Sequence, residues 1–204
     1  MDGLDRAKYM DSEEIQRLQT VTQARMVMDL QAGRKNGVTA WMLVDLALNT
    51  GLRVSEMADL RIGDINLKRE SLTVRRAKKK KRTPETLAIS KTLAMHLKEY
   101  LDWKKLIGHP DSKDSPLFIG GRGPLAPQGL QRIWKAAIHK AGLPKELSIH
   151  SARHTMAVHL LKRTGNLRQV QKQLGHASPV TTANMYADVS FEDMQNGLQD
   201  LYKQ

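Results

Sequence analysis

The chain has no cysteine, few aromatic residues and no long apolar run. Of its 204 residues none is cysteine, 4% are aromatic and 40% are hydrophobic. The lack of cysteine excludes disulfides, thiolate zinc sites and cysteine nucleophiles. Seven histidines without an HExxH pattern give no indication of a catalytic metal, so we expect neither metal nor cofactor. No apolar stretch approaches the roughly 20 residues that cross a membrane, and no signal-peptide pattern opens the chain, so we expect a cytoplasmic protein.

Acidic residues are too few to balance the basic ones. The 33 Lys and Arg face 21 Asp and Glu, which gives a net charge of +12. A polyanionic partner is favoured because each neutralised phosphate releases condensed counterions. We therefore expect nucleic acid as the partner; solubility or attraction to anionic lipid is the other interpretation of the charge. The hydrophobic content suffices for one sizeable core, or at most two small ones.

The first quarter of the sequence predicts a tail followed by two helices. Residues 1–9 carry no pattern and are expected to form a flexible tail, so the fold should begin near position 10. Asp11 with Glu14 resembles an N-capping start. Gly37 is expected to separate this helix from a second one, Thr39–Leu48, which is apolar all round and should therefore be central.

A basic hairpin should follow a short helix. Gly51 is a natural C-terminal stop, and the next helix, through Leu60, places Arg53 at a helix junction. Ser71–Val74 alternates toward a strand, with Thr86–Ile89 as its hairpin partner. The basic run 75–82 lies between them.

The rest of the chain is mainly helical. We expect an α+β fold that is mostly helical with a small antiparallel hairpin. Further helices are indicated over Lys91–Leu106, Leu130–Ala141 and His150–Leu161, after the cap Asn166 up to Gly175, after Ser178-Pro179 up to Tyr186, and over 190–204.

Several ordered motifs resemble the tyrosine recombinase, or phage integrase, family from Met10 to about Val189. They are Thr50-Gly51-Leu52-Arg53-Val54-Ser55-Glu56, the basic hairpin, His150-Ser151-Ala152-Arg153-His154, Leu174-Gly175-His176, and Thr181-Thr182-Ala183-Asn184-Met185-Tyr186. Agreement of several motifs in order and spacing is more specific than one short pattern. The resemblance implies metal-free DNA strand exchange: a tyrosine attacks the scissile phosphate, forms a 3′-phosphotyrosyl link and frees a 5′-hydroxyl.

The chemistry of that reaction explains the residue types. Attack on a phosphodiester builds negative charge on the non-bridging oxygens, and arginine supplies permanently charged bidentate donors, so Arg53 and Arg153 are the predicted clamp. Tyr186, the predicted nucleophile, needs help losing its proton because tyrosine has an ordinary pKa of about 10. We assign the base to His150. By the resemblance, His176 donates to the phosphate and helps to orient the tyrosine.

The leaving 5′-oxygen needs a proton, and a lysine beside two arginines should have a lowered pKa. By the resemblance Lys78 is the predicted acid, because it follows the strand residue Val74 most closely in the manner of the family, with Lys80 next. One residue of slip in the hairpin would exchange the lysine that faces inward. The plain alternative is that the lysine run is a solvated turn. Likewise Arg53 could simply pair with Glu56 or Asp59 on a helix surface.

Other candidates are set aside. His154 and His159 are expected to pack or lie on the surface, and Tyr9, Tyr100 and Tyr202 lack a neighbouring His and Arg constellation. The gap from His176 to Tyr186 is one residue longer than is usual in the family.

The resemblance also bears on domains and partners. Residues 10–204 should form a catalytic domain without the N-terminal core-binding domain of larger members, either as a natural lone domain or as a fragment of a longer recombinase. The resemblance implies double-stranded DNA as the partner and, with it, association with the nucleoid. We expect a homo-oligomer, a tetramer, on DNA, with 190–204 packing on a neighbouring protomer or on its own domain, and an accessory DNA-binding protein. The alternative functions are a non-catalytic DNA-binding regulator and a type IB topoisomerase-like nicking-closing enzyme.

Overall fold

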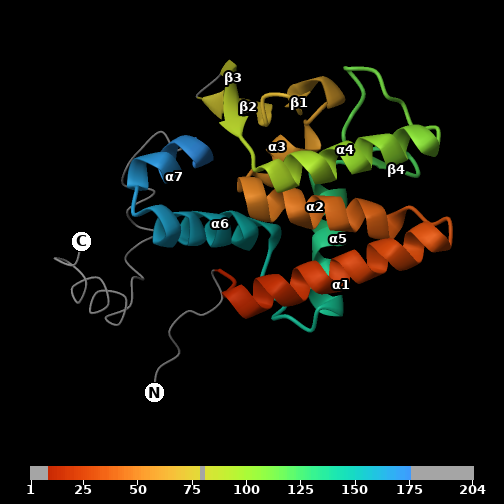
Figure 1. Cartoon of the computed structure of the whole chain (residues 1–204), viewed down its shortest axis with the longest axis horizontal. Helices are drawn as coiled ribbons and strands as arrows, with labels where there is room; N and C mark the ends of the chain where they lie inside the picture. The colour runs from red at the N-terminus through yellow and green to blue at the C-terminus, as the bar shows by residue number, and fades with distance from the viewer. Residues whose placement is uncertain (1–8, 79–80, 176–204) are drawn as a thin grey trace.

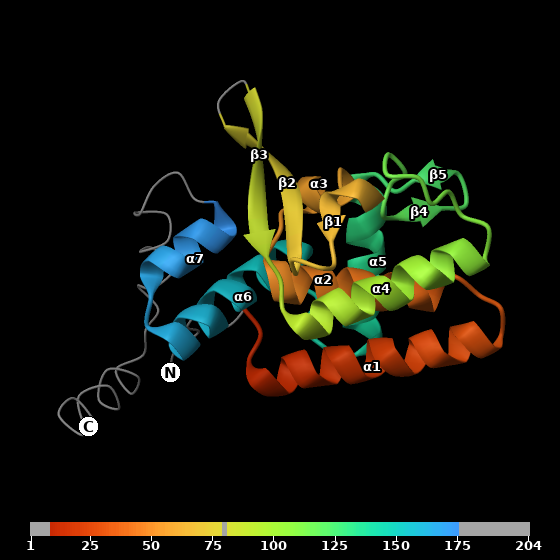
Figure 2. The ribbon, with the colours of Figure 1, turned by 45° about the horizontal axis from the view of Figure 1, so that its top comes forward.

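The computed structural model describes residues 9–78 and 81–175. Figure 1 shows the helices α1, α2 and α4 side by side, with α5 crossing behind α2 and with α6 leading away to α7. The hairpin of β2 and β3 stands beside α7 (Figure 2). No helix in these two ranges is long and apolar enough to cross a membrane. In chain order the elements are α1 Ser12–Gln31, α2 Asn36–Thr50, α3 Val54–Ala58, η1 Ile62–Asp64, β1 Ile65–Asn66, β2 Ser71–Lys78, β3 Lys81–Ala88, α4 Lys91–Leu106, β4 Ile119–Gly120, β5 Gly123–Pro124, α5 Pro127–Lys140, α6 Ile149–Thr164 and α7 Leu167–Leu174.

Helix α1 begins where the capping signal predicts. The Asp11 side chain accepts from the backbone N–H of Glu14, and the Glu14 carboxylate accepts from the N–H of Asp11. The expected break at Gly37 is wrong, because Gly37 lies inside α2 and the two helices separate at 32–35. The Gly37 N–H donates to the buried Asp29 carboxylate at 2.7 Å, and a Cβ there would meet the backbone of α1. Gly37 thus allows a close helix crossing.

Helix α2 is the centre of the fold, as its apolar composition predicts. Its residues from 37 to 48 are buried except Ala40, which is partly buried. Helices α1, α4, α5 and α6 all pack against it. Gly51 ends the helix in a left-handed conformation with φ +62°, the usual geometry of a helix-ending glycine. The chain then turns at once into α3, which ends at Ala58 rather than at the predicted Leu60.

The hairpin extends beyond the two predicted strands, 71–74 and 86–89. Strands β2 and β3 pair antiparallel in a register that runs from Ser71 opposite Ala88 to Lys78 opposite Lys81, and β1 completes the sheet. Most of the basic run is therefore strand rather than loop. Leu72, Val74 and Arg76 are buried in alternation, so this face of β2 points into the protein.

Most of the described apolar residues form one large core, and four more, Met156, Ala157, Val170 and Leu174, form a small separate cluster between α6 and α7. Helix α7 begins at the predicted cap, because the Asn166 side chain accepts from the N–H groups of Arg168 and Gln169. It ends at Gly175, also as predicted. The helices expected beyond that residue lie outside the described residues.

Candidate active site

Arg153 lies in the first turns of α6 and is almost fully buried. Its Nη1 donates to the carbonyl of Gly51 at 2.6 Å, and its Nη2 donates to the carbonyl of Leu174 at 2.7 Å. One guanidinium thereby joins the end of α2 to the end of α7. Burial, together with the positive charges of Arg53 and Arg76, lowers the pKa of Arg153 to about 10, whereas the negative charge of Glu56 opposes this.

Arg53 occupies the junction between α2 and α3, two residues after the carbonyl that Arg153 holds. Its backbone N–H and its Nη1 both donate to the Glu56 carboxylate at 2.8 Å. The pair of Arg53 with Glu56 therefore forms, as in the plain alternative, but its carboxylate is buried and does not lie on the helix surface. The Arg53 side chain is nonetheless 45% exposed, so the guanidinium is held at one edge and open to solvent at another. Glu56 is itself buried and acts as the supporting residue that orients Arg53.

Arg76 is a third guanidinium that sequence reasoning did not select. Its Nη2 donates to the carbonyl of Gln173 at 2.8 Å, its Nη1 lies 3.6 Å from Glu85, and its Nε lies 4.0 Å from Glu56. The signal was present in the alternation of β2, since an arginine follows Leu72 and Val74 on the face that those residues bury. Burial lowers the pKa of Arg76, and Arg53 lowers it too, whereas Glu56 and Glu85 oppose this.

Arg76 and Arg153 both contact the C-terminal end of α7. Carbonyls in the last turn of a helix have no partner within the helix and favour cations. Here the carbonyls of Gln173 and Leu174 each accept from an arginine. Gly175 follows with φ +62°, and a Cβ on it would overlap the Arg76 guanidinium. The last turn of α7 is therefore held in place by two positively charged side chains, directly before position 176.

His150 is exposed on the first turn of α6, three residues before Arg153, and residues at that spacing lie on one side of a helix. Ser148 caps this helix, and its Oγ accepts from the His150 N–H at 3.3 Å. Lys78 is the last residue of β2, and its backbone pairs with Lys81. His176 and Tyr186 lie outside the described residues. The structure therefore brings Arg53 and Arg153 together and places the backbone of His150 and Lys78 on the elements that carry the arginines.

The excluded histidines and two of the excluded tyrosines make contacts outside the arginine cluster. His159 Nε2 is 3.1 Å from the carbonyl of Met10, and the His154 ring packs edge-on against Tyr9. Tyr100 is buried in the core, and burial raises its pKa well above the usual range. It is unsuited to be a nucleophile.

The solvent-exposed Arg53, with Arg153 beside it, can bind an oxyanion, and the buried Arg76 adds to the positive charge around them. Three guanidinium groups face two carboxylates, those of Glu56 and Glu85, so the local charge is positive in a partly desolvated place where charge interactions are strong. Within the described ranges no group of three or more His, Cys, Asp or Glu could hold a metal ion. The charge that this site supplies comes from arginine, whose planar fork matches phosphate.

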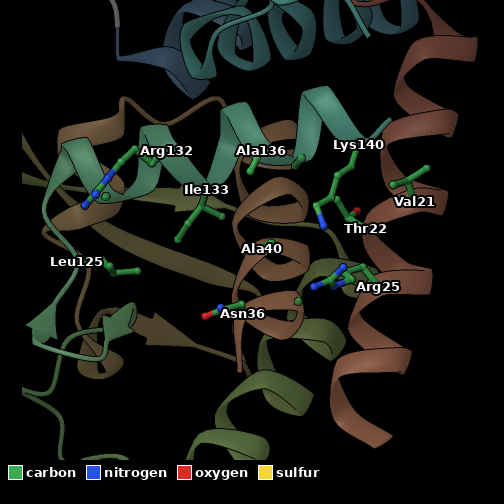
Figure 3. Close-up of a pocket in the computed structure, with 13 residues that line it drawn as sticks. Val21, Thr22, Arg25, Asn36, Ala40, Leu125, Arg132, Ile133, Ala136 and Lys140 are labelled. Atoms are coloured by element: carbon green, nitrogen blue, oxygen red, sulfur yellow. The ribbon is translucent and has the colours of Figure 1, made fainter. Parts of the chain in front are cut away.

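A second feature lies on another side of the molecule. A groove of about 430 Å³ runs between α1, α2 and α5, with an apolar floor that includes Val21, Ala40 and Ile133. Figure 3 shows three cationic side chains around it, those of Arg25, Arg132 and Lys140. None of its lining residues belongs to the arginine cluster.

Comparison with known proteins gives a consistent result. The model of the phage integrase family matches residues 8–193. The chain is 34% identical over 170 residues to tyrosine recombinase XerA of Pyrococcus furiosus, covering 81% of this chain and 55% of the relative. It is 30% identical over 171 residues to tyrosine recombinase XerD of Listeria innocua, covering 82% of this chain and 54% of the relative. The chain thus spans about half the length of these relatives.

Solved structures share the fold. A crystal structure of XerA recombinase superposes with a TM-score of 0.76 at 24% identity, covering 96% of this chain and 64% of the other. The Tn1549 transposon integrase in complex with transposon right end DNA superposes with a TM-score of 0.73 at 19% identity, covering 98% of this chain and 68% of the other. The predicted α+β class, mainly helical with a small antiparallel sheet, is confirmed.

Proposed function

We propose that this chain, which belongs to the phage integrase family of tyrosine recombinases, is the catalytic domain of a site-specific DNA recombinase. The relatives it matches carry that activity in their names, and one similar structure is a site-specific recombinase bound to its DNA substrate before cleavage. The substrate is double-stranded DNA, and the reaction is strand cleavage and rejoining through a 3′-phosphotyrosyl intermediate. Integration, excision and inversion share this chemistry.

The roles follow from the residue types. Arg53 and Arg153 hold the scissile phosphate and stabilise the charge that grows on its non-bridging oxygens. The Tyr186 oxygen bonds to phosphorus as the bond from phosphorus to the 5′-oxygen breaks. The tyrosine proton passes to the His150 imidazole, and Lys78 donates a proton to the departing 5′-oxygen. A 5′-hydroxyl then reverses these steps on the exchanged strand, so no oxidant, reductant or external energy is needed.

His176 completes the proposed site by donating a hydrogen bond to the phosphate. Its support is indirect: Arg153 and Arg76 fix the carbonyls of the last turn of α7, and His176 comes one residue after the helix-ending Gly175. Among Lys78 and Lys80, the register favours Lys78, because it is the last paired residue of the strand whose neighbouring positions form the site.

One observation carries the proposal: Arg53 and Arg153 come from distant parts of the chain and are brought together, because Arg153 donates at 2.6 Å to the carbonyl of Gly51, two residues before Arg53. Like charges gathered in a partly buried site raise the energy of the protein unless an anion joins them. Phosphate oxygens would offset that repulsion, and bidentate contact with arginine gives the orientation that in-line attack requires.

The deciding experiment is a search for the covalent intermediate. The full chain would be incubated with a pool of short nicked duplexes of randomised sequence, because loss of the short cleaved strand traps the phosphotyrosyl adduct. We expect a denaturation-resistant adduct with a preferred sequence, and none from Tyr186→Phe. An adduct that forms on every sequence would identify a nicking-closing topoisomerase. DNA binding without any adduct would identify a regulator and refute the proposal.

We further propose that the protein assembles on DNA as a tetramer, with residues 190–204 of each copy seated in the groove between α1 and α5 of a neighbour. The groove is apolar with a cationic rim. The C-terminal sequence offers the complement, since Phe191, Met194, Leu198 and Leu201 recur at helical spacing among acidic residues.

A charge reversal tests this seat. Arg132→Glu should weaken assembly on the selected duplex, measured by sedimentation, to the same extent as deletion of 190–204, and the two changes combined should add nothing. Assembly unaffected by either change would refute the seat. If deletion of 190–204 also lowers the thermal stability of the isolated monomer, the segment packs on its own domain instead. An accessory DNA-binding protein is expected if the selected duplex binds only weakly.

A further inference from the structure

Arg76 is buried in a way that the fold does not need. It is 2% exposed, and within the described residues its Nε and Nη1 have no hydrogen-bond partner, while Glu56 and Glu85 lie at the longer distances of ion pairs. Removing a guanidinium from water costs energy that loose pairs do not fully return, and apolar residues commonly replace such buried charges without loss of stability. A purely structural demand would be met by a leucine or methionine.

The contacts of Arg76 indicate its use. It lies on β2 two positions before Lys78, so positions 76 and 78 share one face of the strand. Its Nη2 reaches 97 residues along the chain to the carbonyl of Gln173 in the last turn of α7. Gly175 provides the space that the guanidinium fills. One side chain thus joins the strand that ends at Lys78 to the helix end that leads to His176.

We propose that Arg76 is a positioning residue that ties the strand of Lys78 to the end of α7 and so holds the proton donor at the scissile phosphate. This rests on the proposed function, because it gives Lys78 the role of general acid. Arg76 touches neither the phosphate nor the nucleophile in this scheme.

The hairpin rather than α7 depends on this tie. The end of α7 keeps a second hold without Arg76, since Arg153 donates to the Leu174 carbonyl. The hairpin extends away from the helices beside α7 (Figure 2). Its neighbouring Arg75 points to the other side, where it binds Asp64 in a bidentate pair. Another contact between α7 and the hairpin, from Gln173 Nε2 to the carbonyl of Ala88, lies at the opposite end of the hairpin from Lys78. Loss of Arg76 therefore removes the tie nearer to Lys78 while leaving the phosphate clamp in place.

A sulfur-substituted substrate separates this role from a general loss of activity. The duplex recovered in the adduct assay would be made with sulfur in place of the bridging 5′-oxygen, because a thiolate leaves without the proton that an alkoxide needs; a cysteine thiol has a pKa of about 8.5. Arg76→Met should slow cleavage of the ordinary duplex by about 10- to 100-fold, less than the roughly 10²- to 10⁴-fold of a lost general acid, because Lys78 is displaced and not removed. On the sulfur duplex the rate of Arg76→Met should come within about threefold of that of the unchanged chain, and Lys78→Ala should behave in the same way.

The matched control is Arg75→Met, which removes the same charge from the adjacent position on the opposite face of β2. Arg75→Met should leave the ratio of the cleavage rates on the sulfur and ordinary duplexes the same as in the unchanged chain. Arg76→Lys is the second variant if Arg76→Met folds poorly, since it keeps the charge but cannot donate to Gln173 and face both glutamates at once. Normal cleavage of the ordinary duplex by these Arg76 variants, or slow cleavage that sulfur does not restore, would overturn the role.

Hydrogen exchange tests the tie without DNA. Arg76→Met should speed amide exchange in the hairpin over residues 72–88. Arg75→Met should speed the exchange of these amides less, because Arg75 does not contact α7. Unchanged exchange in Arg76→Met would overturn the inference whatever the cleavage result. If the unchanged chain forms no adduct on any duplex, the proposed function fails and the positioning role fails with it, even where exchange shows the tie.

Discussion

Arg153→Lys separates the structural part of this residue from its part in cleavage. The guanidinium donates to two carbonyls that lie on different helices, those of Gly51 and Leu174. A single ammonium on a shorter side chain can reach one of them at most, which leaves a buried carbonyl unpaired at a cost of about 1–3 kcal/mol. For a domain of this size each kcal/mol lowers the melting temperature by about 2–4 °C, so we expect a fall of about 2–12 °C.

The effect on cleavage should be larger than the effect on folding. Loss of one preorganised donor to the developing charge typically costs about 3–4 kcal/mol, or roughly 10²–10³ in rate. The burial and neighbouring arginines that lower the Arg153 pKa to about 10 would also lower that of a lysine there, so the residual cleavage should increase as the pH falls. The measurements are thermal unfolding and the single-turnover rate of adduct formation at saturating DNA.

Arg163→Lys is the control for this experiment, because it makes the same exchange on the exposed last turn of α6. It should change the melting temperature and the rate very little. A melting temperature of Arg153→Lys equal to that of the unchanged chain would contradict the two hydrogen bonds as a structural tie. A rate within threefold of the unchanged chain would contradict the clamp.

Three further outcomes follow from the structure. Gly175→Ala should destabilise the protein by at least about 1 kcal/mol more in urea unfolding than Gly165→Ala, because both glycines end a helix at nearly the same positive φ but only at Gly175 would the new methyl group overlap Arg76; equal losses would show that the contact is unimportant. The buried Lys104, whose pKa burial lowers to about 8, binds its proton more weakly in the folded state than in the unfolded state, so the unfolding free energy should rise between about pH 8 and 10.5; Lys104→Met should remove part of that rise and Lys105→Met should not. The affinity for duplex DNA should fall steeply with salt, with a logarithmic slope of about −0.9 for each phosphate contacted, and a nearly flat dependence would argue against the basic surface as the binding face.

Short-range signals explain how much could be predicted. The caps Asp11 and Asn166 and the helix-ending Gly51 and Gly175 act within a few residues of the backbone that they satisfy, so their residue types alone indicated the helix ends. The apolar composition of α2 likewise predicted its burial. Gly37 misled because its importance comes from the approach of α1, which no local pattern records. The predicted hairpin is too short because its basic residues indicate a loop, although they are compatible with a strand that is exposed on one face.

The ordered motifs were sufficient to identify the family and to nominate Arg53 and Arg153, since a phosphate clamp demands arginine and the motifs specify its position. Only the tertiary structure decided what holds that clamp. Arg153 is set by carbonyls that are 102 and 21 residues away, and Arg76 by one that is 97 residues away. The energies of such contacts depend on burial and on the approach of distant helix ends, which arise only when the whole chain has packed around α2.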